Sequence, residues 1–158
     1  MFDSKDMSLK KKSAGDAAID GLVAGLVGGI VSALVLLVLG LFSGNSTLNI
    51  LQRFDTTANG SALLGTVMHL AVSVIYGALF AILLNLISQV WPAARRISWL
   101  LGIIYGLVLM LLAEVIFSSG FNYQLGELSS IDFALFHIAY GVTLGIVSGR
   151  MASANNES

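Results

Sequence analysis

Four long apolar stretches dominate this chain of 158 residues and leave it few ways to fold. They run over residues 16–42, 61–90, 97–118 and 131–149. Each exceeds or approaches the ~20 residues that a helix needs to cross the hydrocarbon core of a bilayer. Charged residues make up only 11% of the chain, against about a quarter in a soluble domain. The sequence therefore predicts an all-α integral membrane protein whose four transmembrane helices form a bundle over residues 16–150.

The distribution of the basic residues predicts how this bundle is oriented. Of the eight Lys and Arg residues, all but Arg53 would lie on one side of the membrane: Lys5, Lys10, Lys11, Lys12, Arg95, Arg96 and Arg150. Lys and Arg accumulate on the cytoplasmic side of membrane proteins. We therefore expect residues 1–15 and 151–158 to form cytoplasmic tails of a protein of the cytoplasmic (inner) membrane, with the lipid bilayer as its first partner.

Composition and motifs exclude several classes of function. The chain has no cysteine, so it can form neither a disulfide nor a thiolate metal site. Its net charge of −1 offers no basic surface to a nucleic acid. The sequence contains no phosphate-binding loop, catalytic triad or zinc-hydrolase motif. We therefore expect a non-enzymatic protein.

Three of the apolar stretches each carry one ionisable residue within a stripe of residues spaced by four. The other members of these stripes are mostly small: Gly65, His69, Ser73, Gly77 and Ala81; Gly102, Gly106, Met110, Glu114 and Ser118; Phe133, His137, Gly141, Gly145 and Gly149. A spacing of four keeps residues on one face of a helix, and small residues let two helices approach closely. Ionisable groups within a membrane usually face a partner inside the bundle. We therefore expect His69, Glu114 and His137 to meet in the outer half of the bundle.

Such a cluster has three interpretations. In the first, His69 and His137 are the axial ligands of a haem b held between the second and fourth helices. In the second, the same histidines and Glu114 bind a divalent metal through two nitrogens and one oxygen. In the third, each histidine only hydrogen-bonds a carbonyl, Ser73 or Glu114 and ties helices together. The sequence leaves all three open.

Glu114 by itself adds a further alternative, because an unpaired carboxyl group is costly inside a membrane. It predicts a site that accepts a proton or binds a cation from the outer side, as in a small proton-coupled or cation-coupled transporter that uses the histidines as a relay. The structural explanation is that Glu114 lies shallow enough to reach interfacial water near Ser118 and Ser119.

Glycines predict where the helices touch. The packing positions that we expect are Gly21, Gly25, Gly29, Gly77, Gly106, Gly141 and Gly145. In the first apolar stretch the glycines form a pattern of small residues at every fourth position, which lets helix backbones touch. This face would pack either against the other helices of the same chain or against a partner, as in a homo-oligomer or a larger membrane complex.

The second and fourth stretches also resemble each other. When His69 is aligned with His137, small residues coincide four and eight positions later. This correspondence predicts two related helical hairpins that run parallel to each other. Matching Gly29 to Gly106 places Leu37 opposite Glu114, so only one hairpin carries the acid.

Residues 69–77 and 137–145, together with Tyr105 and Gly106, resemble those of small prokaryotic four-helix membrane proteins of the uncharacterised YagU-like kind. The resemblance implies an inner-membrane location and no defined activity, so it assigns no functional residue. The sequence thus favours a small, non-enzymatic polytopic membrane protein, with its histidines as candidate ligands of a haem or metal. The alternatives are an accessory subunit of a larger complex and a small transporter.

Overall fold

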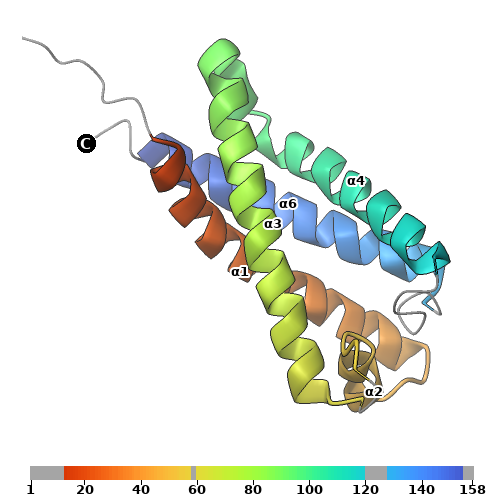
Figure 1. Ribbon diagram of the computed structural model, residues 1–158. Coiled ribbons are helices and arrows are strands. Elements are labelled where there is room, and N and C mark those ends of the chain that lie inside the picture. Colours follow the sequence, from red (N-terminus) through yellow and green to blue (C-terminus); the bar gives the residue numbers. More distant parts are fainter. Residues whose placement is uncertain (1–12, 58–59, 120–127, 155–158) are drawn as a thin grey trace, which may run out of the picture.

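The computed structural model of the chain describes residues 13–57, 60–119 and 128–154, and within these ranges every regular element is a helix. The long helices are α1 (Ala14–Phe42), α3 (Ala62–Val90), α4 (Ser98–Ser118) and α6 (Ser130–Ala154), with the short helices α2 (Thr47–Gln52) and η1 (Pro92–Arg95) in the connections (Figure 1). Four of these helices are long and apolar enough to cross a membrane, which confirms the predicted all-α fold with four such helices. The lysines of the predicted N-terminal tail and residues 155–158 lie outside the described residues.

Local sequence signals set the ends of the helices. α1 begins with a capping box, in which the Ser13 hydroxyl accepts the Asp16 N–H at 3.1 Å and the Asp16 carboxylate accepts the Ser13 N–H at 3.3 Å. α3 begins at Ser61, whose hydroxyl accepts the N–H three residues later. It ends before Pro92, because the residue that precedes a proline avoids the helical conformation.

The helices pack in the order α3, α1, α6, α4, and they do not close into a symmetric four-helix bundle. α1 packs along both α3 and α6, and α6 packs along both α1 and α4. α3 and α4 make only a small contact, meet at η1 and diverge toward the end of the bundle that carries α2 (Figure 1). The bundle is therefore closed between α1 and α6 and open between α3 and α4.

Glycines bring α1 and α3 into backbone contact. A methyl group added to Gly21 would overlap the carbonyl oxygen of Gly77, and one added to Gly25 would overlap that of Ser73. One added to Gly29 would lie 2.7 Å from the Cβ atom of Ser73. Any side chain at these positions would force the two helices apart.

α4 and α6 touch in the same way. A methyl group on Gly102 would overlap the carbonyl oxygen of Gly141, and one on Gly106 would overlap that of His137. Gly145 packs equally closely against the first residue of α4, Ser98. When the two histidine segments are aligned, the Gly102–Gly141 contact corresponds to a contact between α1 and α3, so the two hairpins share a crossing.

The two hairpins nevertheless differ at the position just before a packing glycine. In α1 this position is Gly28, where a Cβ atom would lie 3.1 Å from the ring of Tyr140 on α6. In α4 the corresponding residue is Tyr105, whose side chain extends to α3 and donates a hydrogen bond to the carbonyl oxygen of Tyr76 at 3.0 Å. Glycine lets α1 and α6 close together, whereas the tyrosine ring occupies the space between α4 and α3.

The connection between α2 and α3 is organised by Asp55, which is only 2% exposed. Its carboxylate accepts hydrogen bonds from the backbone N–H groups of Thr57 and Ser61, both at 2.7 Å. Hydrogen bonds to the carboxylate, mainly from Thr57 and to a lesser extent from Ser61, favour its ionised form. They hold the pKa of Asp55 below its ordinary value of 3.8.

This carboxylate makes the stability of the fold depend on pH in the acid range. A carboxyl group with a lowered pKa in the folded state stabilises the fold above its unfolded pKa of 3.8, and that contribution is lost as the pH falls through the lower, folded-state pKa. We expect Asp55→Asn to lower the melting temperature in detergent at about pH 7, and the gap to wild type to be smaller at about pH 3, below the unfolded pKa of 3.8. A gap of equal size at both pH values would contradict this role.

Candidate functional site

The open side of the bundle forms a groove of about 500 Å³ between α3 and α4. Its volume falls in the range of about 300–1,000 Å³ that is typical of small-molecule sites. Two residues that follow α2, Phe54 and Thr56, line it together with side chains from α3, α4 and α6: Met68, His69, Ala71, Val72, Ser73, Tyr76, Leu109, Leu112, Ala113, Ile116, Phe133, Phe136, His137 and Tyr140. Most of these side chains are apolar, and no described residue that lines the groove is Lys, Arg, Asp or Glu.

The groove exists because the facing walls of α3 and α4 have no helix between them. Val72 on α3 is 48% exposed and Leu112 on α4 is 54% exposed, although both line the groove. The residues of α6 beneath them are buried, with Phe136 and His137 each 8% exposed and Tyr140 5% exposed. The groove therefore has a closed floor on α6 and an open mouth between α3 and α4.

The structure places His69 and His137 in this groove, and each ring is held by one nitrogen. Nε2 of His69 lies 2.9 Å from the carbonyl oxygen of Gly29 on α1. Nδ1 of His137 lies 2.9 Å from the carbonyl oxygen of Phe133, one turn earlier on α6. Because a carbonyl oxygen only accepts, these nitrogens carry the protons. The His69 bond ties α3 to α1, whereas the His137 bond stays within its own helix.

Aromatic rings surround the two imidazoles. The ring of Phe54 lies 4.6 Å from that of His69, and the ring of Phe133 lies 4.4 Å from that of His137, between centroids. Phe136 packs against both histidines, at 5.4 Å and 5.0 Å. The two histidines and the rings of Phe54, Phe133 and Phe136 thus form one aromatic cluster in the lining of the groove.

Glu114 does not join the histidines, which corrects the expectation that the three ionisable residues meet. Its side chain is exposed and is absent from the groove lining, whereas Ala113 and Ile116 line the groove. A helix has 3.6 residues per turn, so a stripe with a spacing of four rotates by about 40° at each step. Two steps beyond Gly106, which faces α6, Glu114 has turned by about 80°.

The metal and haem interpretations are therefore not supported. Among the described residues, no group of three His, Cys, Asp or Glu side chains is placed to hold a metal ion, so the set of His69, His137 and Glu114 fails as a site. For haem, the described residues add no support beyond the two histidines, against which Phe136 packs at 5.4 Å and 5.0 Å between ring centroids. What the structure retains of the prediction is that the two histidines line one groove.

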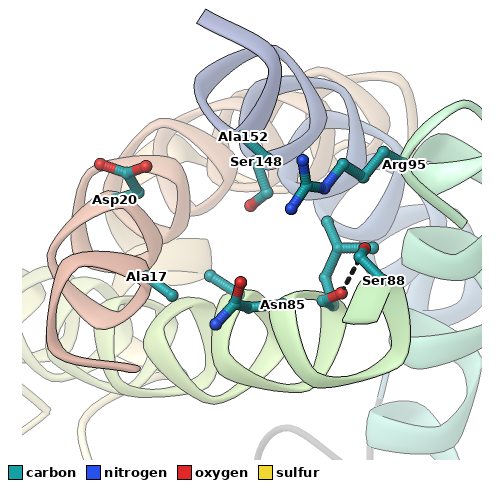
Figure 2. Close-up of a pocket in the computed structure, with 9 residues that line it drawn as sticks. Ala17, Asp20, Asn85, Ser88, Arg95, Ser148 and Ala152 are labelled. Carbon is teal, nitrogen blue, oxygen red and sulfur yellow. Dashed lines mark hydrogen bonds between the residues drawn. The ribbon is translucent and has the colours of Figure 1, made fainter. Parts of the chain in front are cut away.

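A second, much smaller cavity lies at the opposite end of the bundle, beside η1, and the sequence analysis did not identify it. Its volume is about 10 Å³, close to the space that one water molecule needs. Its polar lining comes from α1, α3, η1 and α6: Asp20, Asn85, Ser88, Arg95 and Ser148 (Figure 2). The available signal was the pair Asn85 and Ser88, one turn apart in an otherwise apolar stretch.

We expect one ordered water in this cavity, bound to Ser148. This serine is 3% exposed, and its Oγ has no hydrogen-bond partner among the described residues. If a water is hydrogen-bonded to this hydroxyl, Ser148→Ala removes that hydrogen bond and should lower the free energy of unfolding by about 1 kcal/mol. If no water is bound, alanine removes an unsatisfied hydroxyl and should raise the free energy of unfolding. The sign of the change therefore shows whether a water is bound. Ser153→Ala is the control, since that hydroxyl bonds only its own helix at Gly149.

Comparison with known proteins gives a family without an activity. No curated protein and no solved structure matches the chain significantly. One family model matches, and it describes an uncharacterised family, which agrees with the expectation from the sequence. Nothing links the chain to the YagU-like proteins in particular. The family model covers residues 16–158, which include all four long helices. The chain therefore belongs to the family of unknown function DUF6789.

Proposed function

We propose that this protein is a small, non-enzymatic integral membrane protein that binds the apolar tail of a membrane amphiphile in the groove between α3 and α4. The observation that carries the proposal is the groove itself: about 500 Å³, apolar walls, a closed floor on α6 and an open mouth between two helices that are each long enough to span a membrane. An acyl or isoprenoid chain could enter such a mouth sideways from the surrounding lipid.

The outer surface of the helices supports membrane insertion. Large aliphatic side chains point outward along every long helix, for example Leu34 (55% exposed), Ile75 (59%), Leu111 (60%) and Ile131 (73%). Such a surface would aggregate in water but is suited to lipid. The bias of Lys and Arg toward one side supports a location in the cytoplasmic membrane with both termini inside. The matched crossings support two related hairpins.

The glycines, which the sequence analysis also considered as a docking face, favour a self-contained protein over an accessory subunit. The stripe of α1 that could have bound a partner, Gly21, Gly25 and Gly29, is covered by α3 of the same chain. The described small-residue faces of α4 and α6 likewise pack on each other. A homo-oligomer or larger complex would have to use other surfaces.

A tail-labelled photoreactive lipid tests the proposal. With purified protein in lipid nanodiscs, we expect one saturable label per chain, in peptides from α3 and α4 that contain Val72 and Leu112. Lipid that merely surrounds the protein would also label the outward face of α1 at Leu34, in proportion to lipid concentration and without saturation. Labelling spread evenly over all helices would refute a bound amphiphile.

A further inference from the structure

The groove also carries information about the polar part of its ligand. We propose, building on the proposed function, that the ligand is a neutral amphiphile whose hydroxyl group donates a hydrogen bond to the histidine pair, to either His69 or His137. The inference rests on which hydrogen-bonding groups of the groove are already used and which remain open.

Both imidazoles present a bare nitrogen. Because one nitrogen of each ring donates to a helix carbonyl, the other is the acceptor of a neutral imidazole, Nδ1 in His69 and Nε2 in His137. A charged imidazolium would be costly in an apolar groove whose described lining offers no carboxylate. The neutral form, with one lone pair free, is therefore the relevant one for both rings.

These two acceptors have no hydrogen-bond partner among the described residues. They are not fully buried, since among the described residues Ser148 Oγ is the one side-chain atom that is both fully buried and without a partner. Both rings line the groove and neither nitrogen is fully buried without a partner, so we infer that both are accessible from the groove. In the apolar interior of a membrane an unsatisfied acceptor costs free energy, so a ligand that donates a hydrogen bond to one of these nitrogens is stabilised in the groove.

The protein's own donors nearby are largely committed to backbone acceptors. The Tyr140 hydroxyl donates to the carbonyl oxygen of Ser73 at 2.7 Å, and the Ser73 hydroxyl donates to the carbonyl oxygen of His69 at 2.8 Å. Tyr76 is the remaining hydroxyl in the inner part of the lining, and it can donate to or accept from a ligand oxygen. Apart from the Tyr76 hydroxyl, the hydrogen-bond donors described in the lining are committed, so the two imidazole acceptors are open to a donor from a ligand.

This pattern selects among membrane amphiphiles. A phosphate or carboxylate head would face two lone pairs with no basic residue in the described lining to balance its charge. An ester or ether has no proton to donate. A neutral hydroxyl fits, and the membrane amphiphiles that carry one next to an apolar tail include diacylglycerols and quinols. The aromatic cluster of Phe54, Phe133 and Phe136 is compatible with the flat ring of the second.

Matched probes that differ only at the hydroxyl test the inference. We would measure binding to the full-length protein in nanodiscs by native mass spectrometry for dioctanoylglycerol against its 3-acetyl ester. A decyl quinol would be compared in the same way with its dimethyl ether. In wild type, the hydroxyl member of at least one pair is expected to bind about tenfold more tightly, as the loss of one hydrogen bond implies. The pair that shows the difference identifies the source of the hydroxyl.

Variants of His137 assign the effect, since its hydrogen bond stays within α6 and its replacement leaves the tie between α1 and α3 intact. His137→Phe removes one of the two acceptors and should reduce the preference for the hydroxyl member, and His137→Gln, which keeps an acceptor, should restore part of that preference. Equal binding of both members by wild type would overturn the hydroxyl inference and leave the groove proposal standing. Failure of all four probes to bind would overturn the groove proposal itself.

Discussion

Replacing Gly77 by alanine is expected to destabilise the protein by about 1–3 kcal/mol, the typical range for an overpacked contact. The added methyl group would overlap the carbonyl oxygen of Gly21 and the backbone of Gly25 on α1. These are backbone atoms, so relief requires α1 and α3 to move apart. That movement would weaken the hydrogen bond from His69 to Gly29, which lies along the same crossing.

Gly15→Ala is the matched control for this substitution. Gly15 lies in the first turn of α1, where a Cβ atom would lie 3.7 Å from the Ser13 hydroxyl, an ordinary contact. Alanine favours a helix over glycine, so we expect this variant to be neutral or slightly stabilised. Unfolding in detergent, followed by circular dichroism, measures both. Equal stability of the two variants would show that α1 and α3 do not cross as described.

Replacing Ala113 by tryptophan is expected to lower the amount of bound amphiphile about tenfold or more, a change of at least about 1.4 kcal/mol in binding. Ala113 lies on the α4 wall of the groove, opposite the α3 wall. An indole ring at this position would fill the space that the tail needs. Because the ring covers apolar walls, we expect the melting temperature to stay the same or rise.

Val115→Trp provides the control, two residues along the same helix. Val115 is 67% exposed and is not part of the groove lining, so an indole ring there adds apolar surface without entering the groove. Saturable photolabelling at Val72 should disappear in Ala113→Trp and persist in Val115→Trp. Persistence in both variants would place the binding site elsewhere.

The helices themselves could be predicted from the sequence, because their signals are local. Apolar stretches of sufficient length, Pro92 as a break and serines at helix starts act over a few residues. The first three long helices lie within two residues of the predicted bounds, whereas α6 continues to Ala154, past the predicted end at residue 149. The groove could not be found this way. It arises from residues of α3, α4 and α6 that are far apart in the chain and are brought together only by packing.

The rotation of each helix about its own axis was the main quantity that the sequence did not provide. The stripe through Gly106 and Glu114 was interpreted as one face, but the drift of a spacing of four carries Glu114 out to the exposed side. His69 and His137 remained together because each lies next to a crossing, where close backbone contact fixes the rotation of the helix.

By itself, the sequence determined an all-helical chain with four segments able to span a membrane, glycines at small-residue positions and two corresponding histidine segments. Only the tertiary structure decided that the two hairpins meet along one side and separate along the other. The physical reason is steric: Gly28 admits the ring of Tyr140 between α1 and α6, whereas Tyr105 fills the corresponding space between α4 and α3. The groove with its two histidines lies on the side where α3 and α4 separate.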